Sequence, residues 1–218
     1  MFLCIIVPVV SSCHYRDGVF TELQPGGKNN FARIAVVSFQ RMSPENDSAG
    51  AARCPLCGSI LSTEKFPRDA EKVVESLFFD RLAKLKKFQL IPPDHAGAIY
   101  ERISAESPKM PLMEILKKVG SELEADGVVF AYVCRYRERK GYPYSVELPA
   151  SVAFEIHLVS TSDGNIAWKG IFDKTQKSLM ENVLLIGSFF KGGGQWMTAK
   201  ELAAEGINAI LEKFPGFE

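Results

Sequence analysis

A hairpin of two apolar strands near the carboxyl end constrains the fold of this sequence more than any other feature. The segment Ser151–Ser160, SVAFEIHLVS, alternates strictly, and one side of a strand built from it would carry Val152, Phe154, Ile156 and Leu158. Asp163 and Gly164 form a strong turn signal, and residues 166–172, IAWKGIF, are expected to return as the second strand. The sequence therefore predicts an antiparallel hairpin whose apolar face must be covered by other elements.

Upstream of this hairpin, short apolar runs alternate with amphipathic stretches. A buried strand is expected in ARIAVVSF, and further strands are expected in FQLI from Phe88 and in the long run VVFAYVCRYRER. Apolar residues at helical spacing predict helices over residues 70–85, 94–103 and 111–123, and a last helix opening with a capping box at Thr198 and Glu201. Residues 40–68 are expected to be the longest loop. This order predicts one α/β (α+β) sandwich domain, with amphipathic helices covering a mixed sheet that contains an antiparallel meander.

The amino-terminal residues 2–10 are apolar and uncharged, with the length of a secretory signal and too few residues to span a bilayer as a helix. Ser11 and Ser12 precede Cys13, and small side chains are favoured before a signal cleavage site. Val10-Ser11-Ser12-Cys13 resembles a bacterial lipobox. The resemblance implies a diacylglyceryl group on Cys13, cleavage before it, and an acyl chain such as palmitate on the new amino terminus. The alternative is a short buried strand with an incidental cysteine.

This interpretation divides the chain into residues 1–12 as a lipoprotein signal peptide, 13–30 as a flexible tether and 31–218 as a single α/β domain. No Lys or Arg precedes the apolar run, and a start codon further upstream would supply one. Several acyl chains would hold Cys13 firmly in a membrane. His14 in place of Asp implies, by resemblance to enterobacterial sorting rules, the periplasmic face of the outer membrane. The formal net charge of zero argues against nucleic acid as a partner.

The order of elements resembles a group of bacterial envelope lipoproteins. ARIAVVSF, FQLIPPD, ADGVVFAYV and DGNIAWKG, with the helices between and after them, carry the resemblance over residues 31–214. The group includes the curli-secretion lipoprotein, the lipoprotein activators of penicillin-binding proteins and the amino-terminal domain of the Tol-system propeller protein. The residues of this sequence that carry the resemblance most specifically are Asp163, Gly164 and Trp168, and all three are expected to be structural. The resemblance implies binding or assembly work without catalysis or, alternatively, a subunit of an oligomeric export channel.

The stretch RCPLCG is the sharpest chemical signal in the sequence. Cys54 and Cys57, with two residues between them and with Pro and Gly placed so that backbone amides can point at sulfur, make half of a tetrahedral zinc site. The other half is not evident, because Cys134 lies on an expected strand and His95 and His157 are isolated in the sequence. In an oxidising compartment a local disulfide or a free pair is expected first, and zinc shared across a dimer second. Redox catalysis comes third, because no helix is expected to start directly after the motif. No other cofactor is expected.

Aromatic residues indicate a surface for a protein partner. Tyr and Arg in RYRERKGYPY are typical of interfaces, although an ordinary exposed hairpin end is the alternative. Two phenylalanines in GSFFKGGGQW abut glycines that cannot pack around them, so they are either exposed or tucked under the sheet. The candidate partner-binding residues are Tyr136, Tyr142, Tyr144, Phe189, Phe190 and Trp196.

Sequence motifs of the common enzyme classes are missing: there is no G-x-S-x-G elbow, P-loop, dinucleotide-binding glycine motif or H-E-x-x-H. Together with the lipobox and family resemblances, this implies a non-catalytic envelope lipoprotein with an envelope protein as its partner. A homo-oligomer is compatible with this prediction, and a zinc-binding or redox protein using Cys54 and Cys57 is the second alternative.

Overall fold

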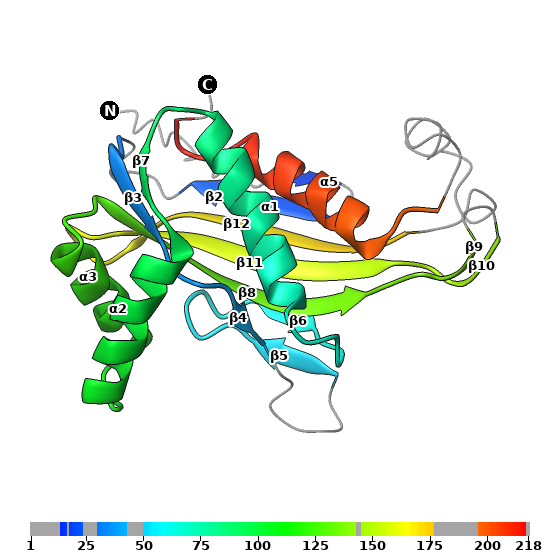
Figure 1. Ribbon diagram of the computed structural model, residues 1–218, viewed down its shortest axis with the longest axis horizontal. Coiled ribbons are helices and arrows are strands. Elements are labelled where there is room, and N and C mark those ends of the chain that lie inside the picture. The colour runs from blue at the N-terminus through cyan, green and yellow to red at the C-terminus, as the bar shows by residue number, and fades with distance from the viewer. Residues whose placement is uncertain are drawn as a thin grey trace, which may run out of the picture.

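The computed structural model describes residues 14–16, 18–23, 30–42, 50–142, 145–176 and 196–216. Over these residues, a mixed sheet has the strand order β1-β2-β12-β11-β8-β3-β7, with β4 paired to β8 (Figure 1). Its strands are β1 (His14–Arg16), β2 (Val19–Leu23), β3 (Arg33–Val36), β4 (Gln40–Arg41), β7 (Gln89–Ile91), β8 (Gly127–Arg137), β11 (Ser151–Ser160) and β12 (Ile166–Thr175). Two separate hairpins are formed by β5 (Ala51–Arg53) with β6 (Ile60–Ser62) and by β9 (Lys140–Tyr142) with β10 (Ser145–Leu148).

The antiparallel hairpin expected from the sequence is confirmed. β11 pairs with β12 in the register Phe154 to Phe172 and Leu158 to Trp168. β8 lies antiparallel on the other side of β11, which completes the expected meander. β3 runs parallel to both β7 and β8, so the sheet is mixed as predicted.

The four expected helices are also confirmed, as α1 (Ala70–Lys84), α2 (Pro93–Glu106), α3 (Leu112–Glu122) and α5 (Ala199–Leu211). The capping box at the start of α5 is present: the Thr198 hydroxyl accepts from the Glu201 backbone N–H, and the Glu201 carboxylate accepts in return. α1 and α5 cover one face of the sheet, and α2 and α3 cover part of the other (Figure 1). Among the described helices, none has both the length and the hydropathy needed to cross a membrane.

Alternation along β11 divides its side chains between the two faces of the sheet. Phe154 and Ile156 face α1 and α5 in the largest apolar core, whereas Glu155 and His157 face the opposite side. Every residue of β11 is buried, because the β5–β6 hairpin and the α2–α3 pair cover that second face. The polar pair is therefore enclosed within the protein.

Two segments differ from the expected division of the chain. Residues 13–30, expected to be a tether, include β2, which pairs along β12 and buries Thr21. Residues 40–68, expected to be a loop, include β4 and the β5–β6 hairpin. Each of these strands has five residues or fewer, so its stability comes from pairing and packing and not from a long hydrophobic pattern of its own.

Candidate functional site

A tight loop between β5 and β6 carries Cys54 and Cys57. Pairing of Arg53 with Ile60 closes the loop, and the Cys54 backbone N–H donates to the Ser59 carbonyl over 2.8 Å. The N–H of Gly58 donates to the Cys54 carbonyl over 2.9 Å. The φ of Gly58 is 74°, a left-handed conformation that glycine adopts without strain.

Backbone amides of this loop point at the sulfur of Cys54, as the prolines and glycines of the motif led us to expect. The N–H of Leu56 lies 3.3 Å from Cys54 Sγ, and the N–H of Cys57 lies 3.5 Å from it. Donors aimed at a sulfur favour its thiolate form. The Cys57 N–H contact acts to lower the pKa of Cys54, but the side-chain hydrogen bond with Cys57 and burial outweigh it.

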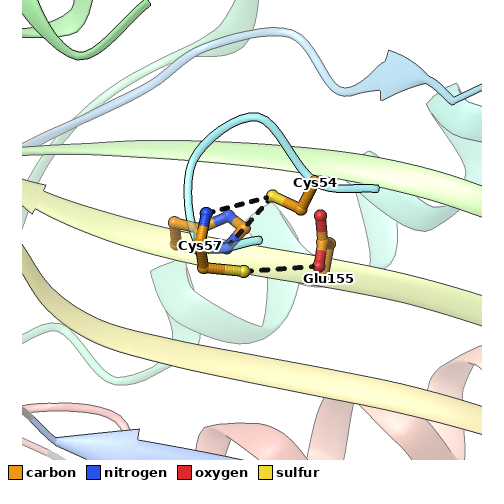
Figure 2. A group of neighbouring side chains, drawn as sticks. Cys54, Cys57 and Glu155 are labelled. Atoms are coloured by element: carbon orange, nitrogen blue, oxygen red, sulfur yellow. Dashed lines mark hydrogen bonds between the residues drawn. The ribbon is translucent and has the colours of Figure 1, made fainter. Parts of the chain in front are cut away.

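The sheet brings two further polar side chains to the same point. Glu155 and His157 are two residues apart on β11, and both are fully buried. Cys54 Sγ lies 3.8 Å from His157 Nε2, and Cys57 Sγ lies 3.8 Å from Glu155 Oε2. Figure 2 shows both cysteines of the loop beside Glu155 on the strand beneath. The sequence-based view of His157 as isolated is wrong, because tertiary contact joins residues 103 positions apart.

The donor atoms of these residues form one compact group. A single ligand atom from each of Cys54, Cys57, Glu155 and His157 lies within 4.8 Å of the other three, and such a group could hold a metal ion. We call these four residues the C2EH cluster. Sequence reasoning missed its second half, although a Glu-x-His pair on the inner side of an apolar strand is a signal that could have revealed it.

Hydrogen bonds inside the cluster leave some polar atoms unsatisfied. The Ser59 hydroxyl donates to Glu155 Oε2 and lies 3.2 Å from Cys57 Sγ. Glu155 Oε1 and His157 Nδ1 are buried and have no hydrogen-bond partner within the described ranges. In that same part of the chain, no Lys or Arg forms an ion pair with Glu155. Buried polar atoms rarely lack a partner in folded proteins.

The two thiols of the cluster have very different proton affinities. The side-chain hydrogen bond between Cys57 and Cys54 lowers the pKa of Cys57 to about 3, and side-chain hydrogen bonding with His157 and Ser59 acts in the same direction. The hydrogen bond with Cys57, followed by burial, raises the pKa of Cys54. Burial also raises the pKa of Glu155. The cluster thus holds one thiolate readily, and further negative charge in this enclosed position requires a cation.

The third cysteine of the described residues packs near Cys54 but is not one of the four cluster residues. Cys134 is fully buried on β8, its Sγ donates to Met42 Sδ over 3.8 Å, and burial raises its pKa. None of Cys54, Cys57 and Cys134 is in a disulfide in this structure. The expectation that no helix opens at the Cys54–x–x–Cys57 motif is confirmed, because α1 starts only at Ala70.

The candidate partner-binding residues fall into separate environments. Tyr142 is 79% exposed on β9, and the β9–β10 hairpin extends beyond the end of the main sheet (Figure 1). Tyr136 is buried in the largest core, so its side chain is not available to a partner, contrary to the expectation from sequence. Trp196 is half-buried. The remaining candidates, together with the expected lipid site, lie outside the described residues: Cys13, Tyr144, Phe189 and Phe190.

Asp163, Gly164 and Trp168, which the sequence led us to expect as structural residues, lie in and just after the turn between β11 and β12. Asp163 Oδ1 accepts a hydrogen bond from the Asn165 N–H over 3.2 Å, and Gly164 has a φ of 72°. Trp168 is fully buried, and its ring packs edge-on against Phe214 with 4.9 Å between ring centroids. The turn and the tryptophan together fix β12 beneath α5.

No family model and no curated protein matches this chain. Among solved structures, the PelC dodecamer from Paraburkholderia phytofirmans aligns with 14% identity and a TM-score of 0.49, covering 90% of this chain and 96% of that one. The lipoprotein GNA1162 from Neisseria meningitidis aligns with 13% identity and a TM-score of 0.39, covering 75% and 98%. The carboxyl-terminal domain of LpoB from Escherichia coli aligns with 15% identity and a TM-score of 0.35, covering 67% and 84%. Likenesses at these TM-scores do not assign the chain to a family.

Proposed function

We propose that this protein is a lipid-anchored component of a bacterial cell envelope that binds or assembles other envelope proteins and catalyses no reaction. The observation that carries the proposal is the junction at Cys13. An uncharged apolar run of signal length ends in Val10-Ser11-Ser12-Cys13, and strand β1 begins at the very next residue, His14. Cleavage before Cys13 would leave the sheet intact. The anchored domain would face the periplasm from the outer membrane.

The position of β1 determines how an anchored domain would sit. β1 pairs with β2 from His14 opposite Thr21 to Arg16 opposite Val19, and β2 pairs with β12. A lipid on Cys13 would therefore be attached directly to the edge of the sheet, without an intervening tether. The domain would be held close to the membrane surface, where its other protruding parts meet neighbouring envelope proteins.

The β9–β10 hairpin is the part of the described chain best suited to contact such a partner. All three residues of β9 are exposed, and Tyr142 presents most of its ring to solvent. Arg139 and Lys140 lie beside it in the sequence. An exposed tyrosine with neighbouring cations is typical of interface anchors, because the ring buries a large area at little entropic cost.

The anchor is tested by the intact mass of the protein purified from membranes, with Cys13→Ser as the control. We expect a wild-type chain that begins at Cys13 and carries the mass of acyl groups, since the thiol is the attachment point. The Cys13→Ser chain should lack this added mass and leave the membrane fraction. An unmodified wild-type chain that retains Met1 would contradict the proposal.

The binding role is tested by a photo-crosslinking amino acid at position 142, introduced into the full chain in living cells. We expect adducts with another envelope protein, because Tyr142 lies on the protruding hairpin. Position 60 is the matched control, since Ile60 is also strongly exposed but lies on β6 of the other hairpin. Equal adducts at both positions, or none at position 142, would remove the β9–β10 hairpin as the binding element while leaving the anchor proposal to its own test.

A further inference from the structure

We propose that the C2EH cluster binds one Zn²⁺ ion, with Cys54, Cys57, Glu155 and His157 as its four ligands, and that this ion fastens the β5–β6 hairpin to the sheet. The inference goes beyond the proposed function and does not depend on it, because neither the anchor nor the β9–β10 hairpin contributes a ligand.

The separations of the donor atoms suit a tetrahedral zinc site. Ligands at the usual zinc distances, about 2.3 Å for sulfur and about 2.0 Å for nitrogen or oxygen, lie roughly 3.3 to 3.8 Å from one another in a tetrahedron. The Cys54 Sγ to His157 Nε2 and Cys57 Sγ to Glu155 Oε2 distances are both 3.8 Å, and no pair exceeds 4.8 Å. Small side-chain rotations that shorten the widest donor separation by about 1 Å would complete the tetrahedron.

The chemical types of the donors select the ion. Two thiolates and an imidazole are soft or intermediate ligands that zinc prefers, whereas magnesium and calcium prefer oxygen ligands throughout. All four ligands come from the protein, so no position is left for a substrate or a reacting water. A closed set of this kind indicates a structural ion and agrees with the absence of catalysis in the proposed function.

A dication would also balance the negative charge that this buried cluster gathers. Glu155 Oε1 has no donor among the described residues, although Glu155 is fully buried. Leu56 and Cys57 direct their N–H groups at Cys54 Sγ, as expected around a metal-bound thiolate. A Zn²⁺ ion would offset the charge of both thiolates and of the Glu155 carboxylate, whose Oε2 lies 3.8 Å from Cys57 Sγ.

The β5–β6 hairpin is the element that gains from such an ion. It pairs with itself, and a small apolar group holds it against the sheet: Met42, Ala52, Cys54, Leu61, Cys134 and Ala153. Metal bonds from Cys54 and Cys57 to β11 would cross-link parts of the chain about 100 residues apart, which removes much of the freedom of the unfolded chain. Zinc would also keep the two thiols from pairing in an oxidising compartment.

The test is the metal content of the full chain, purified without chelators or metal-affinity resin and measured by inductively coupled plasma mass spectrometry. We expect about one zinc ion per chain. Cys57→Ser and His157→Gln should lose the ion, because each removes one ligand. Cys134→Ala and His95→Gln are the matched controls and should retain it, since neither residue belongs to the cluster. Retention of zinc by both ligand variants, or its loss in both controls, would overturn the assignment.

A second measurement on the wild-type chain keeps the proposal testable if the ligand variants do not fold. Co²⁺ added to the reduced protein should give thiolate-to-metal charge-transfer absorption and the intense visible bands of tetrahedral cobalt. A chain with no zinc and no such spectrum would overturn the proposal, as would a Cys54–Cys57 disulfide in protein taken from cells. Neither result bears on the proposed lipid anchor, because the acyl mass on Cys13 tests that anchor separately.

Discussion

Trp168 shows how a single residue can organise the larger core. Its ring lies fully buried against Phe214, beneath α5. Gly170, two positions along β12, leaves the room for it: a Cβ there would lie 2.6 Å from Trp168 Cη2. The indole N–H has no partner in the described part of the chain, so packing and not hydrogen bonding holds this ring in position.

Replacement of Trp168 by Ala should therefore destabilise the protein by about 3 to 5 kcal/mol, because it removes a large buried ring and leaves a cavity. Urea unfolding followed by circular dichroism measures this change. Tyr142→Ala is the matched control, since an exposed side chain should alter the unfolding free energy by less than about 0.5 kcal/mol. An unchanged unfolding midpoint in Trp168→Ala would refute the packing described for this ring.

Strand β2 is the element whose role differs most from the sequence-based expectation. It pairs with β12 over Val19 to Leu23, and Glu22 forms a 2.8 Å ion pair with Lys169 of that strand. Lys169 Nζ also lies 5.2 Å from the centroid of the Phe20 ring. β2 thereby protects the edge of β12, which would otherwise present unpaired backbone groups to solvent.

Truncation distinguishes a tether from a strand. A chain that starts at residue 14 should be stable, whereas a chain that starts at residue 30 should lose about 2 kcal/mol or more of unfolding free energy, because apolar contacts of β2 such as those of Val19 are removed. Thermal and urea unfolding of the two chains make the comparison. Equal stability would mean that β2 adds nothing to the fold and that residues 13–30 act as the tether first expected.

At the scale of the whole molecule, the central sheet is enclosed on both faces. α1 and α5 cover the apolar face, and the opposite face is shared between the α2–α3 pair and the β5–β6 hairpin (Figure 1). This second cover encloses Glu155 and His157, two polar residues that an open sheet would have left in water. Enclosure changes their chemistry, because a buried carboxylate needs a donor or a cation nearby.

The sequence by itself determined the elements whose signals are local. The β11–β12 hairpin, the four helices and the capping box at Thr198 all follow from the spacing of apolar residues and from turn and cap chemistry. These signals act over a few residues, and the fold preserves them. The mixed α/β sheet with its meander could be predicted for the same reason.

Only the tertiary structure decided what lies against each face. Alternation in β11 shows that Glu155 and His157 share a side, but it carries no information about the loop that covers them. For the same reason the sequence did not predict that Tyr136 is buried or that β2 pairs with β12. The cluster joins Cys54 to His157 across 103 positions. Such contacts depend on how separate elements pack, and no local period of the sequence encodes that packing.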